Sequence, residues 1–175
     1  MSGPRVFVTR QLVPEALELI AANTDMEVWP QVEPPTPEQL HQKIADAEGV
    51  LTNIMDRVDS AFFDAAPRIK IVSQLAVGLD NVDVAEATRR NVLVGYTPGV
   101  VSKATADVAF ALLLAAARRV GESERWVRAG EWQLAFHPLR WLGVEVHGAT
   151  LGIVGLGQIG LEMAKRGRGF DMRVI

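Results

Sequence analysis

Between residues 5 and 97, apolar β-branched segments alternate five times with segments of helical spacing. The expected strands are the short apolar runs 5–9, 26–30, 49–53, 69–74 and 92–97. Strands separated by helices run parallel, because each return connection needs about a dozen residues. The alternation therefore predicts an α/β fold: a flavodoxin-like, doubly wound parallel sheet in the order 2-1-3-4-5 with helices on both faces.

The helices expected between these strands carry start signals. Thr36 stands at an N-cap position, Pro37 at the first helical position, and Gln39 where a capping box requires it. Asp83 caps the helix expected over 84–91. Ligands of such a sheet bind beyond the carboxyl ends of its strands, so the residues that follow each strand are candidate binding residues.

From residue 100 onward the pattern changes. A helical segment from about Lys103 to Ala129 is apolar almost all round in its first half, which is typical of a helix buried between layers or subunits. An irregular connection over 130–148 follows. After it come an expected strand, helix and strand over 150–155, 158–169 and 172–175. We therefore expect two domains, over residues 1–99 and 100–175.

The glycines Gly155, Gly157 and Gly160 form a G-x-G-x-x-G loop between the strand and helix just named. The first permits a tight turn, the second lets the backbone approach a pyrophosphate, and the third allows close packing of the helix. The amides at the start of the helix favour phosphate. The predicted cofactor is NAD or NADP, and its predicted contacts are Gly155, Leu156, Gly157, Gln158, Ile159 and Gly160.

An acidic residue about twenty positions after the loop would hold the ribose of NAD, and a basic one would accommodate the phosphate of NADP. The strand expected to carry that residue is 172–175, where the sequence ends. The choice between NAD and NADP is therefore open at this stage.

Composition excludes several other classes of function. The chain has no cysteine, which excludes disulfides, thiolate catalysis and zinc–thiolate sites. The net charge of -3 and the lack of a basic run give no reason to expect nucleic acid. The longest apolar run, 108–117, is too short to span a membrane. The first ten residues lack a signal-peptide core, so we expect a cytoplasmic protein. The sequence contains no H-E-x-x-H motif, and we expect no metal site.

Three linked segments resemble the amino-terminal half of the D-isomer-specific 2-hydroxyacid dehydrogenases, most closely the glyoxylate/hydroxypyruvate reductases. These segments are 72–99, 104–120 and 148–175, in the order and at the spacing of that family. The resemblance implies an NAD(P)-dependent oxidoreductase that acts on the CH–OH group of D-2-hydroxy acids or reduces 2-keto acids such as glyoxylate or hydroxypyruvate. It also implies a substrate domain over 1–99 and the start of an NAD(P)-binding domain over 100–175. Because no face of so short a chain obviously covers the apolar run 108–117, we expect a homodimer formed through 103–148.

The resemblance implies further site residues. Backbone amides of Val77 and Gly78 are expected to hold the substrate carboxylate. Asn53 lies on the same rim, where it contacts substrate or forms a turn. Thr105 approaches the nicotinamide or caps a helix, and Trp141 reaches the partner subunit's active site or packs at a seam.

In the resembled family an arginine, a glutamate and a histidine perform the chemistry, and their positions correspond to residues beyond Ile175. We therefore expect no catalytic residue in this chain, which looks like a truncated portion that is inactive alone. His41, His137 and His147 show no carboxylate partner at a defining spacing. The alternatives are a non-catalytic binding or dimerisation half-module, and a formate or phosphite dehydrogenase on the same scaffold.

Overall fold

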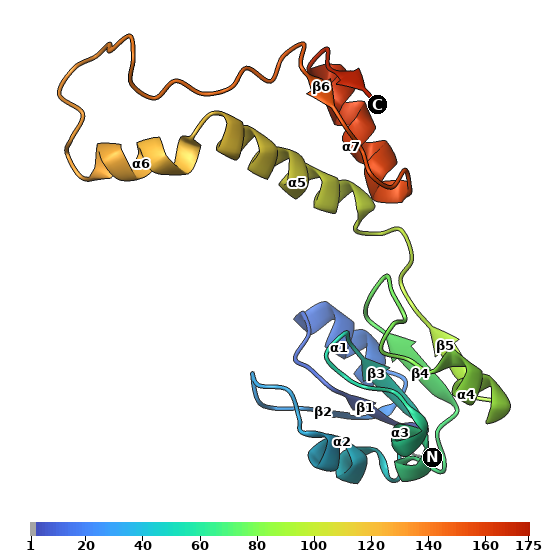
Figure 1. The fold of residues 1–175 in the computed structure, drawn as a ribbon. Coiled ribbons are helices and arrows are strands. Elements are labelled where there is room, and N and C mark those ends of the chain that lie inside the picture. Colours follow the sequence, from blue (N-terminus) through green and yellow to red (C-terminus); the bar gives the residue numbers. More distant parts are fainter. Residues whose placement is uncertain (1–2) are drawn as a thin grey trace. The chain divides into compact units, whose positions relative to one another are not determined.

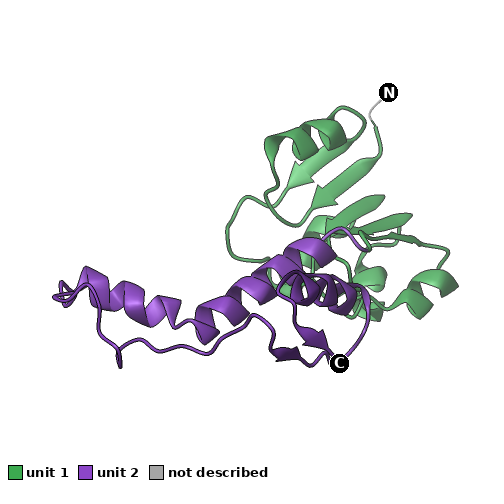
Figure 2. Cartoon of the chain, turned by 90° about the horizontal axis from the view of Figure 1, so that it is seen from above, with its two compact units in different colours: residues 1–98 green, residues 99–175 purple. Residues whose placement is uncertain are grey.

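The computed structural model describes residues 3–175, which form two compact units divided between Pro98 and Gly99 (Figure 2). The division falls one residue before the boundary expected from the sequence. Within the described residues, no helix combines the length and apolar character needed to cross a membrane.

The first unit is built on a five-stranded parallel sheet (Figure 1). Its strands are β1 Arg5–Val8, β2 Asp25–Val28, β3 Gly49–Thr52, β4 Ile71–Gln74 and β5 Leu93–Gly95. They pair in the order β2-β1-β3-β4-β5, and every pairing is parallel. The predicted fold and strand order are therefore confirmed, although most strands end one or two residues earlier than expected.

Four helices connect these strands: α1 Pro14–Ala21, α2 Pro37–Ile44, α3 Ser60–Ala65 and α4 Val84–Arg89. The capping box of α2 forms as predicted: the Gln39 amide donates to the Thr36 side chain, and the Gln39 side chain accepts from the Thr36 amide. Asp59 and Asp83 cap α3 and α4 through the amides three residues later. These caps fix where the chain enters each helix from the sheet edge.

The core of this unit lies on one face of the sheet. Phe7, Val50 and Val72 of the central strands pack against buried residues of α2, α3 and α4, including Phe62 and Phe63. Figure 1 shows α1 on the opposite side of the sheet from α2 and α3. On the α1 side, the outward residues Ile71 and Leu93 remain exposed within this chain, so that face is covered only in part.

The second unit contains α5 Ser102–Ala117, α6 Val120–Arg128, β6 Thr150–Leu151, α7 Gln158–Gly169 and β7 Arg173–Val174. The strands β6 and β7 pair in parallel, with α7 as their crossover. The bounds of α7 match the prediction, whereas both strands are shorter than expected. Phe110 of α5, Leu151 and Met172 form the small core under α7. A Cβ on Gly167 would lie 2.8 Å from Leu151 Cδ2, so glycine allows α7 to pack closely on β6.

The single helix predicted over 103–129 is wrong, because the chain breaks between α5 and α6. Arg119 has a left-handed backbone, with φ of 54°. The Ala117 carbonyl accepts a 2.8 Å hydrogen bond from the Val144 amide instead of continuing the helical ladder. Gly143 lies against the same turn, where a Cβ would approach the Ala117 oxygen to 2.5 Å. The connection that returns at Val144 therefore ends α5. Local periodicity cannot reveal this contact, because its partners lie far apart in the sequence.

Candidate functional site

The glycine loop of the second unit starts where β6 ends and leads into α7. Gly155 has φ of +98°, a backbone conformation that residues other than glycine rarely adopt. A Cβ on Gly160 would lie 2.2 Å from the Gly155 carbonyl oxygen, so no larger residue fits there without moving the backbone. Around Gly157 no atom lies within 4 Å of an added Cβ. Two of the glycines are thus required by the fold, and the third borders open space.

The start of α7 is available to an anion. Its N-cap residue, Gly157, offers no side chain to the free amides of the first turn, and that turn contains no acidic residue. Unpaired amides and the helix dipole give this end a partial positive charge. Leu156 and Ile159 expose their side chains, so they would contribute through their backbone. The arrangement fits a pyrophosphate, as the glycine spacing predicts.

Gln158 also has a structural contact inside the second unit. Its Oε1 accepts a 2.9 Å hydrogen bond from the Ser102 hydroxyl at the start of α5. Thr105 lies one turn into α5, where it is exposed. The N-cap of α5 is Val101, with no side-chain cap, so the helix-capping role considered for Thr105 is wrong.

In the first unit, Val77 and Gly78 lie in the loop that follows β4. Two backbone hydrogen bonds hold the start of the loop. The Leu75 amide donates to the Thr52 backbone oxygen at 2.7 Å, and the Ala76 backbone oxygen accepts from the Thr97 amide at 3.0 Å. Among residues 3–175, neither the Val77 amide nor the Gly78 amide has an acceptor. Both residues are exposed, so these amides can bind an anion.

Asn53, at the end of β3, forms a turn. Its Oδ1 accepts from the Met55 amide at 2.8 Å, and its own amide donates to Asp56 Oδ2 at 2.9 Å. Asp56 is buried, accepts from the Thr9 hydroxyl at 2.5 Å, and lies 3.4 Å from Arg10 Nη2. Sequence reasoning missed this ion pair. The available signal was an arginine and an aspartate in the segments that follow two central strands, β1 and β3.

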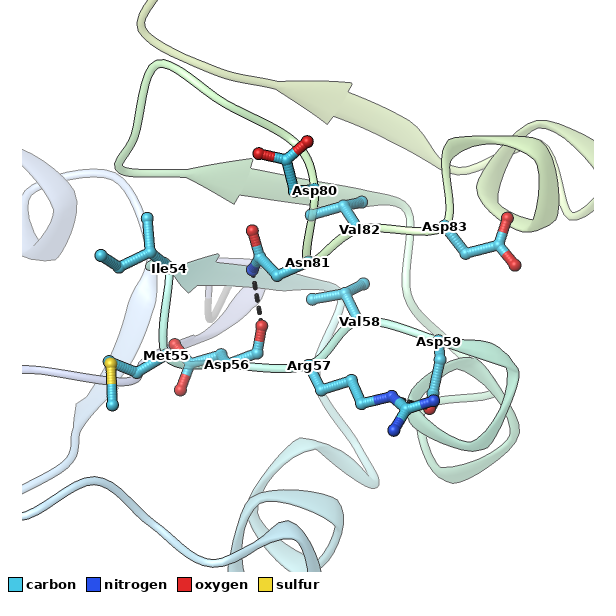
Figure 3. A pocket seen from close by; sticks show the side chains of 10 residues that line it. All are labelled: Ile54, Met55, Asp56, Arg57, Val58, Asp59, Asp80, Asn81, Val82 and Asp83. Atoms are coloured by element: carbon cyan, nitrogen blue, oxygen red, sulfur yellow. Dashed lines mark hydrogen bonds and ion pairs between the residues drawn. The ribbon is translucent and has the colours of Figure 1, made fainter.

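A groove of about 520 Å³ runs between segments 54–59 and 80–83 (Figure 3). Three of its lining residues are exposed or half-buried aspartates: Asp59, Asp80 and Asp83. Its arginine, Arg57, is paired with Asp59 at 2.8 Å. The surplus of negative charge disfavours an anionic substrate, and Asp59 and Asp83 cap helices. The groove is therefore a poor candidate for an anion site.

Trp141 packs inside its own unit. Its ring lies 5.3 Å from the Trp126 ring, and the Arg119 guanidinium stands 5.0 Å above it. Its backbone is left-handed, with φ of 57°, and its indole Nε1 has no hydrogen-bond partner. The neighbouring connection instead exposes apolar side chains, including Phe136 and Leu139. Trp141 therefore anchors the connection to the α5–α6 break in this structure.

The three histidines are separate from both candidate sites. His41 is half-buried in α2, and His137 Nδ1 accepts from the Leu139 amide at 3.2 Å. The sequence showed no carboxylate partner at a defining spacing for any of them, but in the structure His147 Nδ1 lies 3.6 Å from Asp171. Both side chains of this pair are exposed. No cluster of metal-ligating side chains occurs among residues 3–175.

Comparison with known proteins relates the whole chain to one group. Residues 6–166 match the model of the D-isomer specific 2-hydroxyacid dehydrogenase catalytic domain. The chain is 49% identical over its full length to a glyoxylate reductase of Aeropyrum pernix, of which it covers 53%.

Solved structures agree with this relation. A protein of Thermus thermophilus is 41% identical, with a TM-score of 0.89 over 97% of this chain and 54% of that protein. An NADPH-dependent glyoxylate/hydroxypyruvate reductase of Sinorhizobium meliloti, solved with NADP and malonate, is 30% identical, with a TM-score of 0.77 over 99% of this chain and 52% of that protein. The chain thus spans about half the length of the relatives it matches.

Proposed function

Because the chain belongs to the D-isomer specific 2-hydroxyacid dehydrogenase family, we propose that its protein reduces 2-keto acids such as glyoxylate or hydroxypyruvate with NADH or NADPH. The reverse reaction oxidises the CH–OH group of the corresponding D-2-hydroxy acid. Relatives 43–49% identical to the chain are glyoxylate reductases, which supports this substrate class. The observation that carries the proposal is the glycine loop, whose three glycines and uncapped helix start fit a dinucleotide pyrophosphate.

The two units have separate roles in this proposal. In the first, the free amides of Val77 and Gly78 bind the substrate carboxylate, and Asn53 shapes the neighbouring rim. In the second, Gly155–Gly160 holds the pyrophosphate, and Thr105 approaches the nicotinamide. When bound, the nicotinamide supplies the hydride that reduces the substrate carbonyl.

The proposed cofactor is NAD or NADP. The related Sinorhizobium meliloti reductase is NADPH-dependent, which favours including NADP in every test. Both cofactors share the pyrophosphate that the glycine loop would hold, so the loop alone does not select between them.

We further propose that two copies of the chain associate through residues 103–148. Apolar side chains on this segment are exposed in the single chain, among them Val108, Leu112, Phe136 and Leu139. Large apolar side chains left exposed in this way are typical of an interface, and a second copy would cover them. In such a dimer, Trp141 would either reach the partner subunit's active site or stay packed against Trp126 at the seam. Light scattering at tens of micromolar should give the dimer mass, and a clean monomer mass would contradict the proposal.

The activity is tested with the complete protein that the gene encodes. Oxidation of NADH or NADPH, followed by absorbance, should depend on glyoxylate or hydroxypyruvate. Formate and phosphite, tested with the oxidised cofactors, should give no reduction of NAD⁺ or NADP⁺. Activity on either of these alone would transfer the chain to the alternative dehydrogenase class.

The 175-residue chain by itself tests the binding part of the proposal. NADH or NADPH should shift the amide NMR signals of Gly155–Gly160 at millimolar concentration. Gly157→Ala should abolish these shifts without unfolding the chain, because its Cβ has open space and would block only the approaching phosphate. Gly169→Ala in the same helix also has open space and serves as the matched control. Equal binding by both variants would refute the assigned role of the loop.

A further inference from the structure

A buried chain of polar side chains runs under the carboxyl edge of the first unit. Thr52 and Gln74 are the last residues of β3 and β4, with exposed fractions of 0% and 1%. The Thr52 hydroxyl donates to Gln74 Oε1 at 2.7 Å, and Gln74 Nε2 donates to Asn81 Oδ1 at 2.7 Å. Burial of such groups is costly unless they are paired, and here each is paired with the next.

Asn81 completes this chain by joining two loops. Its Nδ2 donates to the Asn53 oxygen at 3.1 Å and to the Asp56 oxygen at 2.6 Å, and the second bond is drawn in Figure 3. The backbone carbonyl of Asn81 accepts from the Val58 backbone amide at 2.9 Å. One side chain therefore ties the loop after β4 to both the end of β4 and the turn after β3.

Few other hydrogen bonds restrain the loop between these fastenings. Beyond Ala76, its backbone bonds lie at its far end: the Val82 amide donates to the Leu79 oxygen at 2.9 Å, and Val58 bonds to the Asn81 oxygen and the Asp83 amide. Val77 and Gly78 lie in this lightly held stretch, with their amides free. An anion site made of backbone amides requires their directions to be set in advance, and a supporting set of hydrogen bonds provides that.

We propose that Asn81 is a positioning residue that holds the Val77–Gly78 amides in their anion-binding arrangement, with Gln74 and Thr52 as its support. Asn81 does not need to touch substrate for this role. The proposal deepens the function proposed above, on which its substrate rests. Removal of the Asn81 side chain leaves the buried Gln74 side-chain amide without its acceptor and breaks both side-chain bonds to the 53–56 turn.

The variants separate this role from a general effect on stability. Asn81→Ala removes both connections. Asn81→Asp keeps an acceptor for Gln74 but loses both donated bonds. Thr52→Val removes the first hydroxyl with little change in shape. The matched controls are Asn23→Ala and Thr88→Val, whose side chains donate to helix carbonyls elsewhere in the same unit.

The first measurement needs no ligand: backbone NMR relaxation of the 175-residue chain. In Asn81→Ala and Asn81→Asp the Val77 and Gly78 amides should become mobile on the picosecond–nanosecond scale, while the strand amides stay rigid. In the two control variants the Val77 and Gly78 amides should relax as in the parent chain. Unchanged relaxation at Val77 and Gly78 would overturn the proposal. If Asn81→Ala does not fold, Asn81→Asp decides by the same criterion.

The second measurement is titration with glyoxylate, followed at the same two amides. The Asn81 variants should bind about ten-fold more weakly than the parent, since two hydrogen bonds that hold the loop are lost. In the complete enzyme the same variants should raise KM for the keto acid and leave KM for the nicotinamide cofactor unchanged. If the parent chain shows no glyoxylate shift, the assignment of Val77 and Gly78 to substrate fails, and relaxation still decides the role of Asn81. Glyoxylate binding with parent affinity in both Asn81 variants would refute the proposal.

Discussion

Gly160→Ala should destabilise the second unit through one identifiable clash. The new Cβ would lie 2.2 Å from the Gly155 oxygen and 3.3 Å from Ile153 Cγ2. A carbon and an oxygen need about 1 Å more than the shorter distance, and the obstacle is backbone rather than a mobile side-chain end. Such overpacking costs about 3 kcal/mol or more. The helix preference of alanine over glycine returns about 1 kcal/mol, so the expected net loss is about 2 kcal/mol or more.

Urea unfolding followed by NMR is the appropriate assay, because the two units need not unfold together. The amides of α7 report the second unit, and those of β3 and β4 report the first. Gly160→Ala should lower the urea midpoint of α7 while the midpoint of the sheet in the first unit stays constant.

Gly169→Ala is the control for helix preference, because its Cβ meets no atom within 4 Å. It should leave the stability of α7 unchanged or raise it by up to about 1 kcal/mol. If Gly160→Ala proves as stable as Gly169→Ala, the close approach of α7 to the Gly155 carbonyl is not a requirement of the fold, and the reasoning fails.

Three other perturbations probe separate parts of the chain. Asp56→Ala should destabilise the first unit by roughly 3 kcal/mol in thermal unfolding, because it leaves the mostly buried Arg10 without its partner; a loss under about 1 kcal/mol would contradict this. A hydrogen bond from Lys70 lowers the pKa of Glu48 below its ordinary value of 4.5. The stability that this pair contributes is therefore present at pH values above 4.5 and is lost as the pH falls through the pKa of the folded state. Glu48→Gln should therefore flatten the acid limb of a stability–pH curve, and an unchanged limb would show that the pair is unimportant. Leu112→Asp, on the exposed side of α5, should shift the mass in light scattering from dimer to monomer with unchanged unfolding, whereas a persistent dimer would exclude that face from the interface.

Local patterns in the sequence were sufficient for the architecture of the first unit and for the glycine loop. Alternating strands and helices allow few parallel arrangements, and the observed order is the one they predict. Gly155 and Gly160 stand where the spacing requires them, with the positive φ and the close approach that only glycine permits. Caps such as Thr36 were readable because their partners lie three residues away.

The errors and omissions concern contacts between residues far apart in sequence. The break at Arg119 accompanies a bond between Ala117 and Val144, and the pairing of His147 with Asp171 depends on the return of the chain after α7. Neither contact has a periodicity, because the separation between partners is set by the connection rather than by helix or strand geometry.

The sequence by itself therefore determined the parallel sheet, its strand order and the position of the glycine loop, since these follow from short-range backbone geometry. Only the tertiary structure decided which polar side chains meet at the sheet edge. Asp56 reaches Thr9 across 47 residues, and Asn81 reaches the Asn53 oxygen across 28. Parallel strands bring such residues together at one edge, but side-chain packing in the folded core selects which donor faces which acceptor.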